Sequence, residues 1–66
     1  MFNVSPEVKA QLLNERLNAL NLEGYQHELN RKTAEAIGNA EAIQQADDAI
    51  VIIQAAIAVV ETELNG

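Results

Sequence analysis

The 66-residue sequence contains no cysteine and no tryptophan, and its only proline is Pro6. Phe2 and Tyr25 are its only aromatic residues. Without cysteine, disulfide bonds and thiolate metal sites are excluded, and the redox compartment cannot be inferred. Domains below roughly 70–80 residues usually need a disulfide, a metal or a partner chain for stability. Association with another chain is the stabilising device that remains.

Positive charge is also scarce, because four Lys and Arg residues stand against ten Asp and Glu residues, a net charge of -6. This charge repels the phosphates of nucleic acids and of anionic lipids. The carboxylates are scattered along the chain, as on ordinary solvated helix faces, and are not gathered as a mimic of nucleic acid would require. We therefore expect neither nucleic acid nor a membrane as a partner.

The sequence also lacks a long hydrophobic run. Its most apolar stretch, residues 49–60, is 12 residues long and is interrupted by Gln54. A helix that spans a bilayer needs about 20 predominantly apolar residues. The stretch therefore predicts a buried helix and not a membrane helix.

The residues that are present predict two long helices. Ser5 can cap a helix whose first position is Pro6, the one helical position where proline is favoured. Gly38 can end that helix in the left-handed conformation, and Asn39 can cap the next one. We expect one all-α domain over residues 1–66, with helices at about 5–37 and 40–64 joined at 38–39. A two-residue corner folds such helices into an antiparallel αα-hairpin.

The hydrophobic period supports coiled-coil-like packing of this hairpin. Apolar residues of the second helix alternate spacings of three and four. A corner at residues 38 and 39 places residue i roughly opposite residue 77 − i. Two stripes then come into register. The predicted intrachain seam consists of Leu13, Leu17, Leu20, Gly24, Ile53, Ile57, Val60 and Leu64.

The register of the first helix changes after Gly24. The same stripe would continue through His27 and Arg31, which are polar. Either the helix turns a different face inward or it breaks at Gly24, and a continuous or gently bent helix is favoured. In that case the inward residues would be Leu22, Tyr25, Leu29, Ala36 and Ile37. The glycine would let the two backbones approach opposite Ile53.

The second helix is apolar around most of its circumference, and one neighbouring helix covers a stripe of only about 100°. We therefore predict self-association into a multi-helix bundle, with this helix inside. Isoleucine at both seam positions favours trimers or tetramers over dimers in parallel coiled coils. A heteromeric protein partner that covers the same face is the alternative. The predicted oligomer interface consists of Ala49, Ile50, Ile52, Ala56 and Val59.

Candidate sites for chemistry are few. His27 follows Glu23 by four residues, whereas bundle di-iron proteins use Glu-x-x-His. Asp47 and Asp48 lack the loop of alternating oxygen ligands that calcium requires. No glycine-rich phosphate loop or nucleophile with a paired base is evident. We expect no metal, no cofactor and no enzymatic activity.

The N-terminal residues allow two interpretations. Phe2 and Val4 can pack near Lys9 and Ala10 as a hydrophobic staple. Alternatively, residues 1–4 form an arm that docks on a neighbouring subunit.

The segment 23–30, followed by Ala34-Glu35-Ala36 and Gly38-Asn39, resembles short proteins encoded by tailed bacteriophages, including those that infect marine cyanobacteria. The resemblance covers about half of the chain. It implies a small virion component or an accessory factor, located in the virion or the host cytoplasm, and it carries no functional residues.

Three functions are consistent with this sequence. The leading hypothesis is a non-enzymatic structural or assembly protein that self-associates through its helices, such as a minor virion component. The second is a small acidic regulatory module that lays its apolar helix against a host protein. The third is a metal-binding helical bundle.

Overall fold

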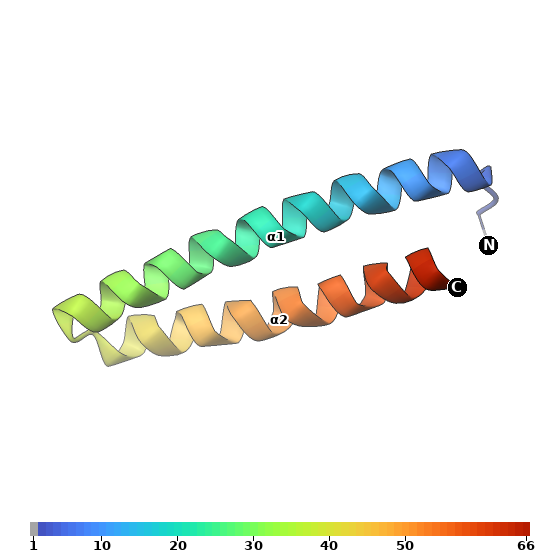
Figure 1. The fold of residues 1–66 in the computed structure, drawn as a ribbon. Coiled ribbons are helices and arrows are strands. Elements are labelled where there is room, and N and C mark those ends of the chain that lie inside the picture. The colour runs from blue at the N-terminus through green and yellow to red at the C-terminus, as the bar shows by residue number, and fades with distance from the viewer. Residues whose placement is uncertain (1) are drawn as a thin grey trace.

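The structure, a computed structural model that describes residues 2–66, consists of two helices. Helix α1 spans Pro6–Ile37 and helix α2 spans Ala40–Asn65. The helices run antiparallel along each other, so that both termini lie at the end opposite the connection (Figure 1). No strand occurs within residues 2–66. The prediction of an all-α helical hairpin is confirmed.

Helix α1 begins where its first residues satisfy the orphan backbone groups of a helix start. The Ser5 hydroxyl oxygen accepts a hydrogen bond from the Val8 N–H at 3.3 Å, and Pro6 occupies the first turn, where no donor is needed. Glu7 lies in the same turn, where its negative charge faces the positive end of the helix dipole. Ser5 itself is therefore the cap and not the first helical residue.

The corner ends one helix and starts the next within two residues. Gly38 adopts the left-handed conformation, with φ 70° and ψ 30°. The Gly38 N–H donates to the Glu35 carbonyl at 3.2 Å and the Asn39 N–H donates to the Ala34 carbonyl at 2.9 Å, a Schellman arrangement. The Asn39 side chain accepts from the Ala42 N–H at 3.0 Å. Because each residue closes one helix end, no further loop is needed and the helices must lie side by side.

The interface between the helices is built on a cluster of buried residues in the half of the hairpin that contains the termini. Leu20, Ile53 and Val60 are its buried members. The hydrophobic residues packed against this cluster are Leu13, Leu17, Ala56, Ile57 and Leu64. Gly24 lies opposite Ile53, as the pairing of residue i with 77 − i requires.

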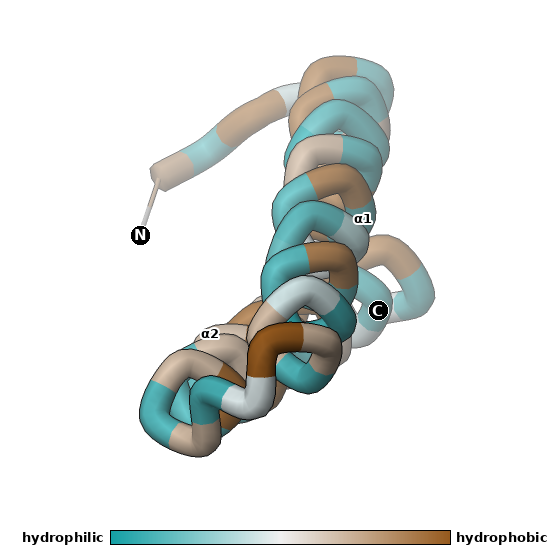
Figure 2. The backbone as a smooth tube through the Cα atoms, turned by 90° about the vertical axis from the view of Figure 1, so that its left-hand side faces the viewer, coloured by the Kyte–Doolittle hydropathy of each residue, from teal (hydrophilic) through white to brown (hydrophobic). Residues whose placement is uncertain are grey.

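Helix α1 is continuous through Gly24, as favoured from the sequence, but the expectation that a different face turns inward after Gly24 is wrong. The helix does not break there, and it keeps the same face inward: His27 and Arg31 are half-buried and Ala34 is buried. The apolar residues expected to turn inward are exposed instead, namely Leu22, Tyr25, Leu29, Ala36 and Ile37. The buried residues of this half are small, namely Ala34 on α1 and Ala46 on α2. They let the helices lie close together next to the connection, whereas the helices diverge toward the termini (Figures 1 and 2).

The environment of Gly24 leads to a prediction about stability. A Cβ atom at this position would lie 3.4 Å from Ile53 Cγ2, which is an ordinary van der Waals distance. Alanine in a helix interior is favoured over glycine by about 1 kcal/mol. Gly24→Ala should therefore raise the free energy of unfolding by up to about 1 kcal/mol, measured by urea denaturation. Gly24→Leu, whose side chain Ile53 cannot accommodate, should lower it. A marked loss of stability in the alanine variant would mean that a Cβ atom at position 24 lies closer to Ile53 than 3.4 Å and clashes with it.

The hairpin is a thin rod with a large surface. Its extents are 49 × 17 × 17 Å and its radius of gyration is 15.2 Å, compared with about 11 Å for a compact domain of this length. The accessible surface is 5177 Å², whereas a globular monomer of 7.2 kDa exposes about 4,100 Å². Two helices alone therefore leave on the order of 1,000 Å² more surface in water than a globular protein of equal mass.

Candidate functional site

The first feature that bears on function is the small size of the core. Among residues 2–66 only five are buried, and two of them are alanines. None of the described side chains is completely shielded from solvent. The buried residues are Leu20, Ala34, Ala46, Ile53 and Val60.

Helix α2 retains an uncovered apolar surface after it has packed on α1. Ile52 is 69% exposed and Val59 is 64% exposed, although the neighbouring residues Ile53 and Val60 are buried. Val51 is exposed on the same helix. Soluble monomers rarely leave such residues together in water, so this surface is the candidate site.

The five residues expected at an oligomer interface have different positions. Ile52 and Val59 are exposed, whereas Ala49, Ile50 and Ala56 are half-buried. Ala56 contacts the intrachain cluster, so it borders both surfaces. All eight residues expected in the intrachain seam are brought together between the helices.

Ile52 and Val59 belong to a continuous side of the hairpin, which we call the lateral face. On α2 its residues recur at spacings of four and three, which places them on one flank of the helix. They are Gln45, Ala49, Ile52, Ala56, Val59 and Glu63. On α1 the corresponding flank carries Leu12, Arg16, Ala19, Glu23 and Asn30, and its first four residues line one shallow groove. A second groove is lined by His27 and Asn30 together with Gln45, so both flanks lie on the same side of the molecule.

Charge is distributed unequally between the two helices. All four Lys and Arg residues are on α1, and α2 carries five carboxylates and no basic residue. On α2 the carboxylates lie at 41, 47, 48, 61 and 63, on either side of the charge-free stretch 49–60. Lys9 and Glu63 form an ion pair between the helices at 3.7 Å. The exposed apolar centre of α2 is therefore bordered by negative charge at both ends.

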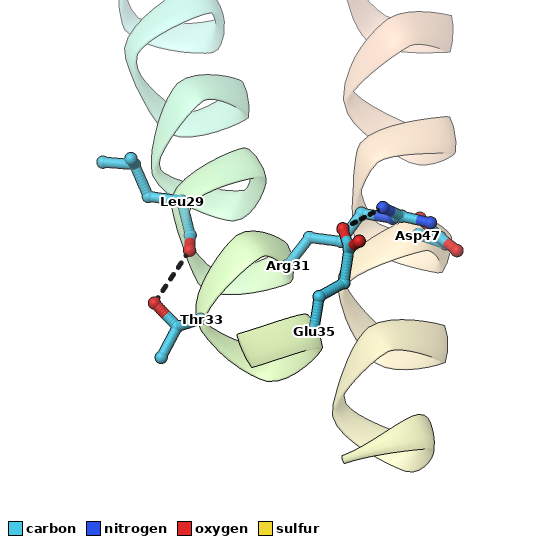
Figure 3. A network of polar contacts seen from close by, with 5 residues as sticks. All are labelled: Leu29, Arg31, Thr33, Glu35 and Asp47. Carbon is cyan, nitrogen blue, oxygen red and sulfur yellow. Dashed lines mark hydrogen bonds and ion pairs between the residues drawn. The ribbon is translucent and has the colours of Figure 1, made fainter. Parts of the chain in front are cut away.

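Arg31 makes the other polar bridge between the helices. Its Nε donates to Asp47 Oδ1 at 2.5 Å, and its guanidinium also binds Glu35 one turn further along α1 (Figure 3). The hydrogen bond and the charge of Asp47, followed by the charge of Glu35, raise the pKa of Arg31 above its usual value. This bridge explains how the polar residue Arg31 can lie on the inward face of α1, because its side chain reaches from α1 to Asp47 on α2.

The candidate metal residues do not converge. Within residues 2–66 no three His, Asp or Glu side chains come together as a metal site requires. His27 lies half-buried beside Asn30 and Gln45, and Asp47 is engaged with Arg31. Asp48 accepts a hydrogen bond from the Gln44 amide at 2.9 Å. Ordinary surface interactions thus account for these side chains.

The N-terminal segment does not form the expected staple. Phe2 is 99% exposed, and residues 2–5 lead away from α1 (Figure 2). The interpretation that Phe2 packs against α1 is therefore wrong, because this side chain touches almost nothing in its own chain. The interpretation of residues 1–4 as a docking arm stays a prediction, and Met1 lies outside the described residues.

Helix α2 is long and apolar enough, by length and composition alone, to cross a membrane. Its polar residues argue against this. Asp47 and Asp48 lie within the helix, and the charge-free stretch 49–60 is only about 18 Å long at 1.5 Å per residue, whereas the hydrocarbon core is about 30 Å thick. The expectation that no membrane is involved stays a prediction, which vesicle binding tests below.

Comparison with protein-family models, with curated proteins and with solved structures gave no match. The resemblance to phage proteins accordingly stays a prediction, and function must be argued from the geometry described above.

Proposed function

We propose that this protein is a non-enzymatic structural or assembly protein that acts through helix–helix self-association. The observation that carries the proposal is the pair of large aliphatic side chains, Ile52 and Val59, exposed on the lateral face beside a five-residue core. Full burial of one such side chain is worth about 1.5–3 kcal/mol. A small domain has only about 5–15 kcal/mol of total stability, so covering this face changes stability substantially.

The proposal links folding to association. If assembly buries the lateral face, the folded state becomes more stable as the protein concentration increases. Thermal unfolding followed by circular dichroism should therefore give a midpoint that rises over a concentration series from about 1 to 100 µM. A midpoint independent of concentration, in a chain that is fully helical at the lowest concentration, would contradict the proposal.

The charge of the chain predicts a salt dependence. Each copy carries a net charge of -6, and α2 carries only carboxylates, so bringing copies together costs electrostatic energy. Raising the ionic strength from about 0.1 to 1 M shortens the Debye length from about 10 to 3 Å and screens this repulsion. We expect the association constant from sedimentation equilibrium to increase with NaCl concentration. A decrease would indicate that attraction between opposite charges dominates the interface.

The same charge distribution favours one second candidate, a small acidic regulatory module that binds a host protein. A helix with five carboxylates and no basic residue is complementary to a basic, apolar-grooved partner. This function predicts a chain that stays monomeric and marginally folded alone, and that binds one partner stoichiometrically with an affinity that falls as salt is added. The two candidates therefore differ in their salt dependence: self-association should become stronger as salt is added, whereas binding to a basic partner should become weaker.

A further inference from the structure

We infer that the occupant of the lateral face is a second copy of this chain, arranged so that α2 of each copy lies between its own α1 and the α1 of the other. The inference rests on the proposed function and adds to it the geometry of the assembly. The preference of isoleucine-rich seams for trimers or tetramers applies to parallel coiled coils. Here Ile53 and Val60 face an antiparallel α1, so we infer a dimer of hairpins instead.

Each helix of the hairpin presents side chains in two directions about a right angle apart. Consecutive residues of an α-helix point about 100° apart. Ile52 therefore points about 100° away from Ile53, and Ala19 points about 100° away from Leu20. In a four-helix bundle of square section, each helix has two neighbours at about a right angle. In each helix, the stripe that contains Ile53 or Leu20 thus faces the other helix of the same hairpin. The stripe that contains Ile52 or Ala19 points to where a further helix of such a bundle would lie.

The charges of the two helices favour contact between unlike helices. If α2 packed on α2 of another copy, ten carboxylates would approach with no basic residue between them, twice the five of one helix. If α2 packs instead on α1 of another copy, it meets the helix that holds every basic residue. The pairing of residue i with 77 − i, applied between copies, places Glu63 level with Asn14 of the second copy, and Arg16 lies two residues away on the flank that faces Glu63. Charge therefore selects contact between unlike helices.

One side of the hairpin has the size of a standard interface. A rod side of 49 × 17 Å has a footprint of about 800 Å², which is the area that each partner buries in an interface of standard size. The same register places Val59 level with Asn18 of the second copy, and the adjacent Ala19 lies on the flank that faces Val59, a large side chain against a small one. With the twofold axis parallel to the rods, all neighbouring helices are antiparallel, as in up-down-up-down bundles.

The absence of cysteine makes this arrangement directly testable. Ala19 and Val59 are both exposed, so Ala19→Cys and Val59→Cys should leave the hairpin folded. At facing positions on adjacent helices, the distance between the two Cα atoms falls in the range of about 4.4–6.8 Å that a disulfide spans. The two single variants are mixed, unfolded and refolded together, and oxidised gently. About half of the randomly paired dimers are then mixed and should become covalent, giving a band at twice the mass of the 7.2 kDa chain.

The controls separate this arrangement from others. Each single variant oxidised alone should remain monomeric on a denaturing gel, because like positions lie diagonally across the bundle. Asn18→Cys, which is exposed but points about 100° away from Ala19, should not cross-link with Val59→Cys. A disulfide in either single variant alone would overturn contact between unlike helices. A native dimer without a cross-link in the mixture would overturn this register, whereas a native monomer would overturn the proposed function as well.

Discussion

Replacing Ile53 with aspartate is expected to unfold the hairpin. Ile53 is 6% exposed and packs with Leu20 and Val60 in the only cluster of large buried side chains within the described residues. The substitution removes about 1.5–3 kcal/mol of apolar burial and places a carboxylate where no positive group lies beside it. The combined loss is comparable to the whole stability of a small domain, so we expect the helical circular dichroism signal to fall to that of an unfolded chain.

Glu61→Lys serves as the matched control for this substitution. Glu61 is exposed on the same helix, and reversing its charge disturbs no buried group. Surface substitutions of this kind usually change stability by less than about 0.5 kcal/mol. If the two variants lost equal amounts of helix, the assignment of Ile53 to the interior would be wrong.

Replacing Ile52, the preceding residue, with aspartate is expected to dissociate the proposed assembly without unfolding the hairpin. Ile52 makes few contacts in its own chain, and the new carboxylate would remain in water in the monomer. In the assembly the same carboxylate would be buried against the neighbouring copy. We expect a loss of about 2 kcal/mol or more in association, which corresponds to a Kd roughly 30-fold weaker.

Two measurements on one sample check this prediction. Sedimentation should show a shift toward the mass of a single chain, while circular dichroism at high concentration should retain the helical signal. Gln54→Asp is a suitable control, because Gln54 is polar, exposed and on the flank of α2 away from Ile52. Equal dissociation of both variants would indicate a general charge effect and not a contact made by Ile52.

The fold could be predicted from the sequence because the deciding signals are local. Ser5 and Pro6 start one helix, and Gly38 and Asn39 close it and cap the next with their own hydrogen bonds. The facing of the half that contains the termini could also be predicted, since large aliphatic residues recur at spacings of three and four on both helices.

The half beside the corner could not be predicted, because hydrophobicity is a poor guide where small residues decide packing. Tyr25, Leu29 and Ile37 are more apolar than His27 and Arg31, yet they face water. The buried alanines Ala34 and Ala46 set a close approach that polar side chains can border, and Arg31 reaches Asp47 at the edge. Both alanines can be seen in the sequence, but that they are buried between the helices becomes clear only once the two helices are paired.

The lateral face was partly visible in the sequence. The excess of apolar circumference on α2 predicted an uncovered surface, and Ile52 and Val59 are exposed in the hairpin. The contribution of α1 to the same side was missed, because Leu12 and Ala19 are separated by Arg16 and do not form a hydrophobic run. Heptad spacing on α1, followed from Leu12 to Asn30, is the signal that could have revealed it.

Membrane binding by α2 is tested with vesicles of zwitterionic and of anionic lipid. A protein assembly that buries Ile52 and Val59 should remain in solution with both kinds of vesicle. Co-flotation that the Ile52→Asp substitution abolishes would assign the same face to lipid instead.

A hairpin of this sequence leaves Ile52 and Val59 of its second helix uncovered, and the proposed self-association depends on this exposure. Sedimentation equilibrium of the purified chain at micromolar concentration measures the outcome directly. We expect an integral multiple of 7.2 kDa, and specifically the mass of a dimer. A stable, fully helical species with the mass of one chain, at all concentrations and salt conditions, would contradict it.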